Sequence, residues 1–172
     1  MISRSLFASD EAWLWWNEKY DTVNPPVRRV SRATKIYIVG SLKNAKVQAM
    51  AVGLRKLGYD VFDDWHAAGP DADDYWQAYE KARGRSYSEA LAGAHAQDVF
   101  AFDKRHIDAA DVVILALPAG KSGHLEFGYA IGSGKKGIIC LDGEPERFDV
   151  MYNFATAVVN NLEDLEKELG TL

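Results

Sequence analysis

Residues 112–117 read Val-Val-Ile-Leu-Ala-Leu, an unbroken apolar run that follows Asp111 and precedes Pro118. A run this uniformly apolar is typical of a strand buried on both faces of a parallel sheet, because a half-exposed strand would alternate apolar and polar residues. Four further segments have the composition of strands, at residues 36–39, 59–62, 137–141 and 157–159.

Helical patterns lie between these strands. Apolar residues recur at helical spacing from Val47 to Leu57, a second helix is expected at residues 125–131, and a last helix opens at Asn161 and ends at Gly170. The alternation of strands and helices predicts an α/β fold, a three-layer Rossmann-like (flavodoxin-like) domain with a mostly parallel sheet of about five strands.

Two segments stand outside this alternation. Residues 1–34 predict an N-terminal arm with a short Trp-rich helix, and residues 35–172 form the α/β domain. A long insertion at about residues 64–110 separates the second strand from the third. It is too long for a structureless loop, and its composition predicts two helices, at residues 75–82 and 87–102.

Charge and cysteine content narrow the possible functions. The chain has 172 residues and a net charge of −5, which argues against polynucleotide binding through a basic face. The single cysteine, Cys140, excludes an intrachain disulfide and favours a reducing compartment. Because no apolar run approaches the roughly 20 residues of a membrane helix, we expect a cytoplasmic protein with no membrane partner. The N-terminal residues lack the apolar stretch of a signal peptide.

The ends of the strands are where a ligand would bind, since open parallel sheets bind ligands outside the carboxyl ends of their strands. Gly40 and Ser41 follow the first strand and precede a helix. This pair fits a phosphate or sugar cradle and fits a tight structural turn equally well.

A second candidate region follows the apolar run, where residues 118–130 read Pro-Ala-Gly-Lys-Ser-Gly-His-Leu-Glu-Phe-Gly-Tyr-Ala. Glu126 is expected in the first turns of a helix, facing the ligand crevice, although a solvated surface glutamate is the alternative. Asp103 is expected on the helix that precedes the apolar run. Paired carboxylates are what glycosidic chemistry requires, but spacing alone leaves this pairing open.

Four segments together resemble one enzyme family. They are Lys-Ile-Tyr-Ile-Val-Gly-Ser at residues 35–41, the run from Asp103 to Asp111, Gly-His-Leu-Glu-Phe-Gly-Tyr-Ala at residues 123–130, and Asp-Val-Met-Tyr at residues 149–152. They look like the nucleoside 2-deoxyribosyltransferases and their nucleotide N-hydrolase relatives. The resemblance implies a homodimer or higher homo-oligomer that cleaves the N-glycosidic bond of a small-molecule nucleoside or nucleotide, with no metal or other cofactor.

The resemblance also implies roles for individual residues. Glu126 matches the nucleophile that attacks the anomeric carbon, Asp103 matches the acid, and Tyr37 matches a residue beside the sugar. Asp149 falls where the transferases carry an asparagine contributed by a neighbouring subunit.

Two positions depart from the family pattern. Gly120 stands where the transferases usually have Asp, and His124 stands where they usually have Gly. Gly120, Ser122, Gly123 and His124 remain candidates for substrate binding, and Ser122 with Lys121 could contact a 5′-phosphate. His124 could be an acid, a substrate contact or a structural histidine at the start of a helix.

The insertion is the other departure, because residues 60–81 hold seven carboxylates against one lysine. One interpretation is helix capping and solvation. The other is a base pocket made by Asp63, Asp64, Trp65 and Trp76. Alternatives for the whole protein are a nucleotide-sensing module without turnover, a TIR-like NAD glycohydrolase and a phosphoribohydrolase.

Overall fold

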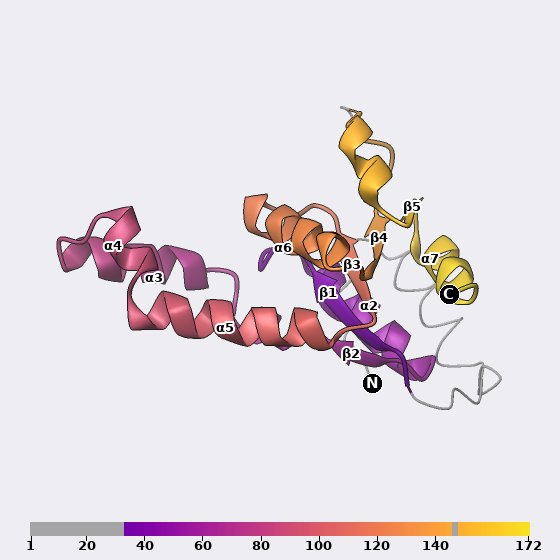
Figure 1. Ribbon diagram of the computed structural model, residues 1–172, viewed down its shortest axis with the longest axis horizontal. Coiled ribbons are helices and arrows are strands. Elements are labelled where there is room, and N and C mark those ends of the chain that lie inside the picture. The colour runs from indigo at the N-terminus through magenta and orange to yellow at the C-terminus, as the bar shows by residue number, and fades with distance from the viewer. Residues whose placement is uncertain (1–32, 146–147) are drawn as a thin grey trace.

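A computed structural model describes residues 33–145 and 148–172 of the chain. Five strands form one sheet, in which every neighbouring pair runs parallel (Figure 1). The strand order is β2-β1-β3-β4-β5, the flavodoxin-like order of doubly wound domains. The strands span Lys35–Val39 (β1), Asp60–Phe62 (β2), Val112–Ala116 (β3), Lys136–Cys140 (β4) and Ala157–Val159 (β5). The predicted α/β fold with five strands is confirmed, and the expected N-terminal arm lies outside the described residues except for its last two.

Strand β3 occupies the middle of the sheet. It pairs with β1, where Ile36 aligns with Val112, and with β4, where Ile138 aligns with Ile114. All five residues of β3 are buried, as the uniformly apolar run predicts.

Helices cover both faces of the sheet, which gives three layers. On one face, α2 (Lys46–Lys56) and α7 (Leu162–Leu169) pack on a cluster that includes Ile36 and Ile38. On the other face, α5 (Ala94–Ala109) and α6 (Lys121–Gly132) pack on Tyr37 and Val39. Because successive side chains of a strand point to opposite faces, residue 37 is directed toward α5 and α6.

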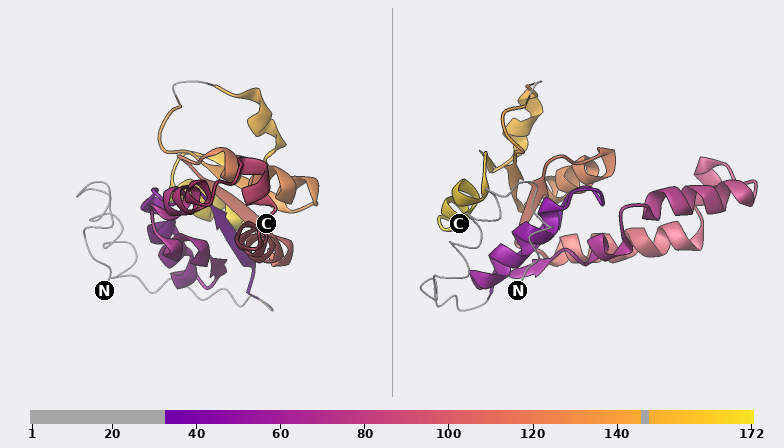
Figure 2. Two further views of the ribbon diagram at one scale, coloured as in Figure 1. Left: turned by 90° about the vertical axis from the view of Figure 1, so that its left-hand side faces the viewer. Right: turned by 180° about the vertical axis from the view of Figure 1, so that it is seen from behind.

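The insertion forms more elements than predicted. It contains η2 (Asp64–Ala68), α3 (Ala72–Ala82), α4 (Tyr87–Leu91) and α5. Helices α3, α4 and the first part of α5 extend away from the sheet as a projecting hairpin (Figures 1 and 2). The acidic residues Asp73 and Asp74 lie in the first turn of α3, where the helix dipole favours negative charge.

The single helix predicted at residues 87–102 is wrong, since the chain breaks between α4 and α5. Ser86 and Glu89 form a capping box that starts α4, and Gly93 takes an extended conformation as the N-cap of α5. Helix α5 then continues to Ala109, which brings Asp103 back against the sheet domain.

Cys140 closes β4 as a free and buried thiol. Burial raises the pKa of this thiol to about 11. Among the described residues, no helix is both long enough and apolar enough to cross a membrane.

Candidate active site

Three of the predicted site residues meet on one face of the sheet. Tyr37 comes from β1, Asp103 from α5 and Glu126 from α6. The Tyr37 hydroxyl donates a hydrogen bond to Oε2 of Glu126 across 3.4 Å, and the carboxyl of Asp103 interacts with the same hydroxyl. Tyr37 is 1% exposed, so its phenol approaches both carboxyls from inside the protein.

The protonation of these groups follows from their burial. Burial, with the negative charge of Asp103, raises the pKa of Glu126 to about 7, although the hydrogen bond from Tyr37 opposes the shift. Burial also raises the pKa of Asp103, and burial together with both carboxylates raises the pKa of Tyr37 far above its usual value. The phenol therefore stays a hydrogen-bond donor, and burial makes it unfavourable for both carboxyls to ionise together.

One oxygen of the Asp103 carboxyl, Oδ1, is buried and has no hydrogen-bond partner within the part of the chain that the structure describes. An unpaired buried polar atom is costly, and such atoms often serve a ligand. Asp103 is thus arranged so that one oxygen faces Tyr37 while the other remains available to hold or transfer a proton.

The Tyr37 ring is the first in a stack of three aromatic rings. Phe62 of β2 stacks on Tyr37 with ring centroids 5.2 Å apart, and His106 of α5 stacks on Phe62 with centroids 3.7 Å apart and planes 10° apart. Neither Phe62 nor His106 was predicted from the sequence to belong to the site. The signal for His106 was its position three residues after Asp103, which places both on one side of a helix.

Gly40 and Ser41 form the turn after β1, and close packing explains the glycine. A Cβ at residue 40 would lie 2.7 Å from Cγ2 of Val47, closer than side chains tolerate. The Ser41 hydroxyl accepts a hydrogen bond from the backbone N–H of Lys43 across 3.2 Å. The structural turn is therefore formed, with or without a ligand.

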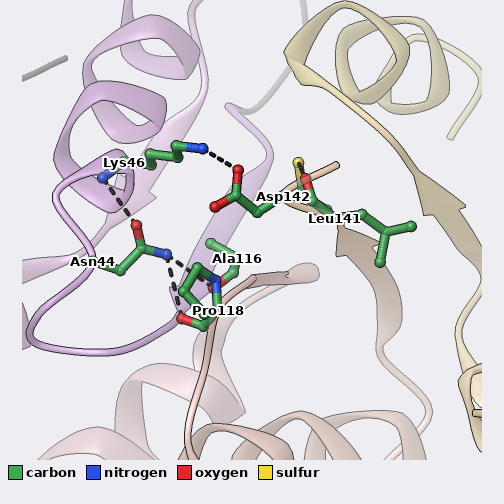
Figure 3. Close-up of polar contacts among 7 residues, drawn as sticks. Asn44, Lys46, Ala116, Pro118, Leu141 and Asp142 are labelled. Carbon is green, nitrogen blue, oxygen red and sulfur yellow. Dashed lines mark hydrogen bonds and ion pairs between the residues drawn. The ribbon is translucent and has the colours of Figure 1, made fainter. Parts of the chain in front are cut away.

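Asn44 ties this turn to the loop after β3, and sequence reasoning missed it. Its side-chain Nδ2 donates to the carbonyl oxygens of Ala116 (3.3 Å) and Pro118 (3.4 Å), and its Oδ1 accepts from the N–H of Lys46 (3.1 Å) (Figure 3). Lys46 also forms an ion pair with Asp142 after β4. The buried side chain of Asn44 thereby joins the loop after β1 to the loop after β3.

Helix α6 begins four residues earlier than predicted, at Lys121, so Ser122, Gly123 and His124 lie within the helix. Its N-cap, Gly120, provides no side-chain cap, and Ser122 is exposed. A Cβ at residue 123 would lie 3.1 Å from Cγ1 of Val39, so a glycine there lets α6 lie close to β1.

His124 has partners for both ring nitrogens. Its Nδ1 lies 2.8 Å from the carbonyl oxygen of Gly120, and its Nε2 lies 3.1 Å from the hydroxyl of Tyr152. Because a carbonyl only accepts, Nδ1 carries the proton and Nε2 accepts from Tyr152. These contacts join α6 to η3 (Val150–Phe154).

The four residues of the hypothetical base pocket lie in different surroundings. Trp65 donates from Nε1 to the carbonyl oxygen of Ile38 across 2.8 Å and packs against the core on both faces of the sheet. Asp63 forms an ion pair with Arg55, and Asp64 is exposed in η2.

Trp76 lies in the projecting hairpin, where it lines a separate cavity of about 400 Å³ with Glu80 and Arg85. The lining of that cavity includes none of Asp63, Asp64 and Trp65. The structure therefore does not show these four residues as one pocket.

Asp149 acts within its own chain as the N-cap of η3, since its Oδ1 accepts from the N–H of Met151 across 2.9 Å. Segment η3 stands away from the sheet (Figure 1). In the described part of the chain, no group of three or more His, Cys, Asp or Glu side chains is arranged to hold a metal ion.

Comparisons with known proteins give matches among solved structures. No protein-family model matches the chain, and no curated protein gives a significant match. Among solved structures, the chain is similar to Clostridium botulinum CMP N-glycosidase, BcmB, with a TM-score of 0.49 and 14% identity over 80% of this chain and 99% of that chain. What the site does must therefore be inferred from its own residues.

Proposed function

We propose that this protein cleaves the N-glycosidic bond of a nucleoside or nucleoside 5′-monophosphate, by hydrolysis or base exchange, with Glu126 as the nucleophile. The observation that carries the proposal is the Tyr37 hydroxyl held against two half-buried carboxyls from α5 and α6. Two carboxyls in unlike roles are the requirement for breaking a glycosidic bond through a covalent intermediate.

The chemistry assigns one role to each group. The ionised Oε of Glu126 attacks the anomeric carbon while the C–N bond breaks and its electron pair passes to the base. In the protonation state that reacts, the proton lies on the carboxyl of Asp103, which gives it to the departing base. Water, or the nitrogen of a second base, then attacks the anomeric carbon, the bond from that carbon to the Glu126 oxygen breaks and restores the carboxylate, and Asp103 takes a proton back from the attacking group.

Tyr37 orients the nucleophile in this scheme. Its hydroxyl donates to the Glu126 carboxylate and so favours the ionised form, against the burial that disfavours it. The charge on the carboxylate also stabilises the positive charge that develops on the sugar.

The start of α6 supports a monophosphate as substrate. Lys121 and Ser122 are exposed in the first turn of a helix whose N-cap supplies no side chain, so its backbone N–H groups and the lysine can receive an anion. A free nucleoside would leave these groups to water.

A homo-oligomer is part of the proposal. Large apolar side chains are exposed on three elements near the site, and Leu125 on α6 is 75% exposed. The others on α5, α6 and η3 are Val99, Phe100, Phe102, Tyr129, Val150, Met151 and Phe154. A second copy covering these side chains would remove them from water, and Asp149 of η3 could then reach a neighbouring site.

Base release tests the proposed function. The protein is incubated with nucleosides, their 5′-monophosphates and NAD, with and without a second free base, and products are separated by chromatography. Glu126→Gln should lower release at least about 1000-fold, and Glu163→Gln, at an exposed position of α7, is the matched control. Full activity of Glu126→Gln would contradict the mechanism, and tight binding without release would favour a sensor.

A further inference from the structure

A hydrogen bond between side chains joins the two helices that carry the carboxyls. The hydroxyl of Tyr129 on α6 donates to Oδ1 of Asp108 on α5 across 2.7 Å. Asp108 follows Asp103 by five residues and Tyr129 follows Glu126 by three, so the contact lies within two helical turns of each carboxyl. The proposed mechanism uses neither Asp108 nor Tyr129.

Asp108 is also held through its other two oxygens. Nζ of Lys104 donates to Oδ2 across 2.7 Å, and Nζ of Lys135 donates to the backbone oxygen across 2.5 Å. Lys135 donates further to the carbonyl oxygen of Ala110 across 2.8 Å. Because Lys135 follows α6 in the chain, it ties the end of that helix to the end of α5, where the helix dipole favours a cation.

Tyr129 is held through its ring as well as through its hydroxyl. Nζ of Lys104, which pairs with Asp108, lies 4.9 Å from the centroid of the Tyr129 ring, and a cation is attracted to the face of an aromatic ring. A single exposed ion pair contributes little to stability, but several charges and hydrogen bonds that meet at one residue form a network. The network around Asp108 therefore restrains α5 and α6 relative to each other.

The site depends closely on the spacing of these helices. Tyr37 belongs to β1, and its hydroxyl donates to Oε2 of Glu126 across 3.4 Å. A bond between two oxygens is ordinarily about 2.7–2.8 Å long, so this one is near its limit and a small movement of α6 would break it. Because Asp103 reaches the same hydroxyl from α5, the phenol can meet both carboxyls at only one spacing of the two helices.

We infer that Asp108 and Tyr129 are positioning residues that fix the spacing of α5 and α6, and with it the placement of Asp103 and Glu126 around the Tyr37 hydroxyl. A misplacement of about 1 Å can slow an enzymatic reaction roughly 100-fold. The consequence for catalysis rests on the proposed function, whereas the effect on the Tyr37 hydroxyl does not.

Carbon-13 NMR of the tyrosine Cζ atoms tests the inference without any substrate. The chain has eight tyrosines, and Tyr37→Phe identifies the signal of Tyr37 by its loss. Tyr129→Phe, which keeps the ring, should move the Tyr37 signal toward the value of an unbonded phenol. Tyr79→Phe is the matched control, because the exposed Tyr79 hydroxyl accepts from Arg83 on the projecting hairpin, and it should leave the Tyr37 signal in place.

Kinetics of base release test the consequence for the reaction. Tyr129→Phe and Asp108→Ala should each lower kcat roughly 10-fold and change KM by less than about twofold, because the reacting groups are misplaced while the binding groups remain. Asp108→Asn keeps an oxygen that can accept from Tyr129, so its kcat should stay within about threefold of the unmodified protein. An Asp108→Asn variant as slow as Asp108→Ala would contradict the role of this hydrogen bond.

The outcomes separate this inference from the proposed function. An unmoved Tyr37 signal in both Tyr129→Phe and Asp108→Ala would overturn the positioning role, whether or not the protein releases base. A moved Tyr37 signal with unchanged kcat would also overturn it. A moved signal in a protein that releases no base from any substrate would support the positioning role and refute the proposed function.

Discussion

The Tyr37 hydroxyl lies 3.4 Å from Oε2 of Glu126 while also contacting the carboxyl of Asp103, so one buried phenol joins carboxyls from two different helices. Tyr37 is a residue of β1, and its ring stacks on the ring of Phe62. The distance between the two carboxyls is thus set by the packing of α5 and α6 on β1.

Tyr37→Phe removes the hydroxyl and keeps the ring. The expected result is a fall in kcat of about 10- to 100-fold with little change in KM, because the hydrogen bond orients the nucleophile. The hydrogen bond lowers the pKa of Glu126, so its loss should also move the acid limb of the kcat profile to higher pH. A limb that moves to lower pH would contradict this role.

Base release should depend on the ionisation of Glu126. Because the pKa of Glu126 is raised to about 7, activity should increase as pH rises through this value, rather than through the value near 4 of an exposed glutamate. The measurement is kcat/KM between pH 5 and 9 with a fixed substrate. A profile that is flat from pH 5 to 7 would show that Glu126 is not the nucleophile.

Ionised Glu126 should lower the free energy of unfolding at high pH. Its folded pKa is raised above the unfolded value, so its favourable contribution is present below about pH 4.5 and is lost as pH rises through about 7. Glu126→Gln should therefore be more stable than the unmodified protein by roughly 1–3 kcal/mol at pH 8.5 and little different at pH 4. Urea unfolding at the two pH values measures the difference, and equal gains at both would refute the explanation.

Asn44→Ala removes the tie between the loops after β1 and β3. The carbonyl of Ala116 and the N–H of Lys46 lose a partner, so the free energy of unfolding should fall by about 1–3 kcal/mol and KM should rise. Asn153→Ala is the control, because Asn153 also donates to a carbonyl but is exposed in η3. Similar losses in both variants would mean that the tie has no special effect.

Gly40→Ala should destabilise the fold by about 1–3 kcal/mol, since the added Cβ would lie 2.7 Å from Val47. Gly128→Ala on α6 is matched in chemistry, but its Cβ would meet no atom within 4 Å and alanine favours the helix. Thermal unfolding of the two variants should therefore differ in sign. Equal melting temperatures would show that the Val47 side chain moves aside without loss of stability.

Local sequence patterns predicted the sheet well because its signals are local. Each strand combines branched or aromatic residues with a turn residue nearby, and residues 112–117 are apolar because both faces of β3 are covered. The last helix was equally predictable, since the side chain of Asn161 accepts a hydrogen bond from the N–H of Asp164, as expected of an N-cap. The break at Gly93 was missed because the residues around it have helical composition on both sides.

The site was less predictable because its contacts are distant in sequence. Tyr37 and Glu126 are 89 residues apart, and their pairing was suggested by a family resemblance rather than by spacing. Asn44 and Ala116 are 72 residues apart, and nothing near Asn44 distinguishes it from an ordinary turn asparagine. Trp65 illustrates the same limit. From the sequence alone, an aromatic residue near the end of a strand could stack on a ligand or pack inside the fold. The hydrogen bond from Trp65 to the carbonyl oxygen of Ile38 shows that it packs inside the fold.

The lone cysteine at the end of β4 has a practical consequence. Its burial and raised pKa leave almost no reactive thiolate at neutral pH, so thiol reagents should spare it in the folded protein. A cysteine introduced at exposed Leu125 would then carry a fluorophore selectively. Energy transfer between labelled copies would report directly on whether two α6 helices come together in solution.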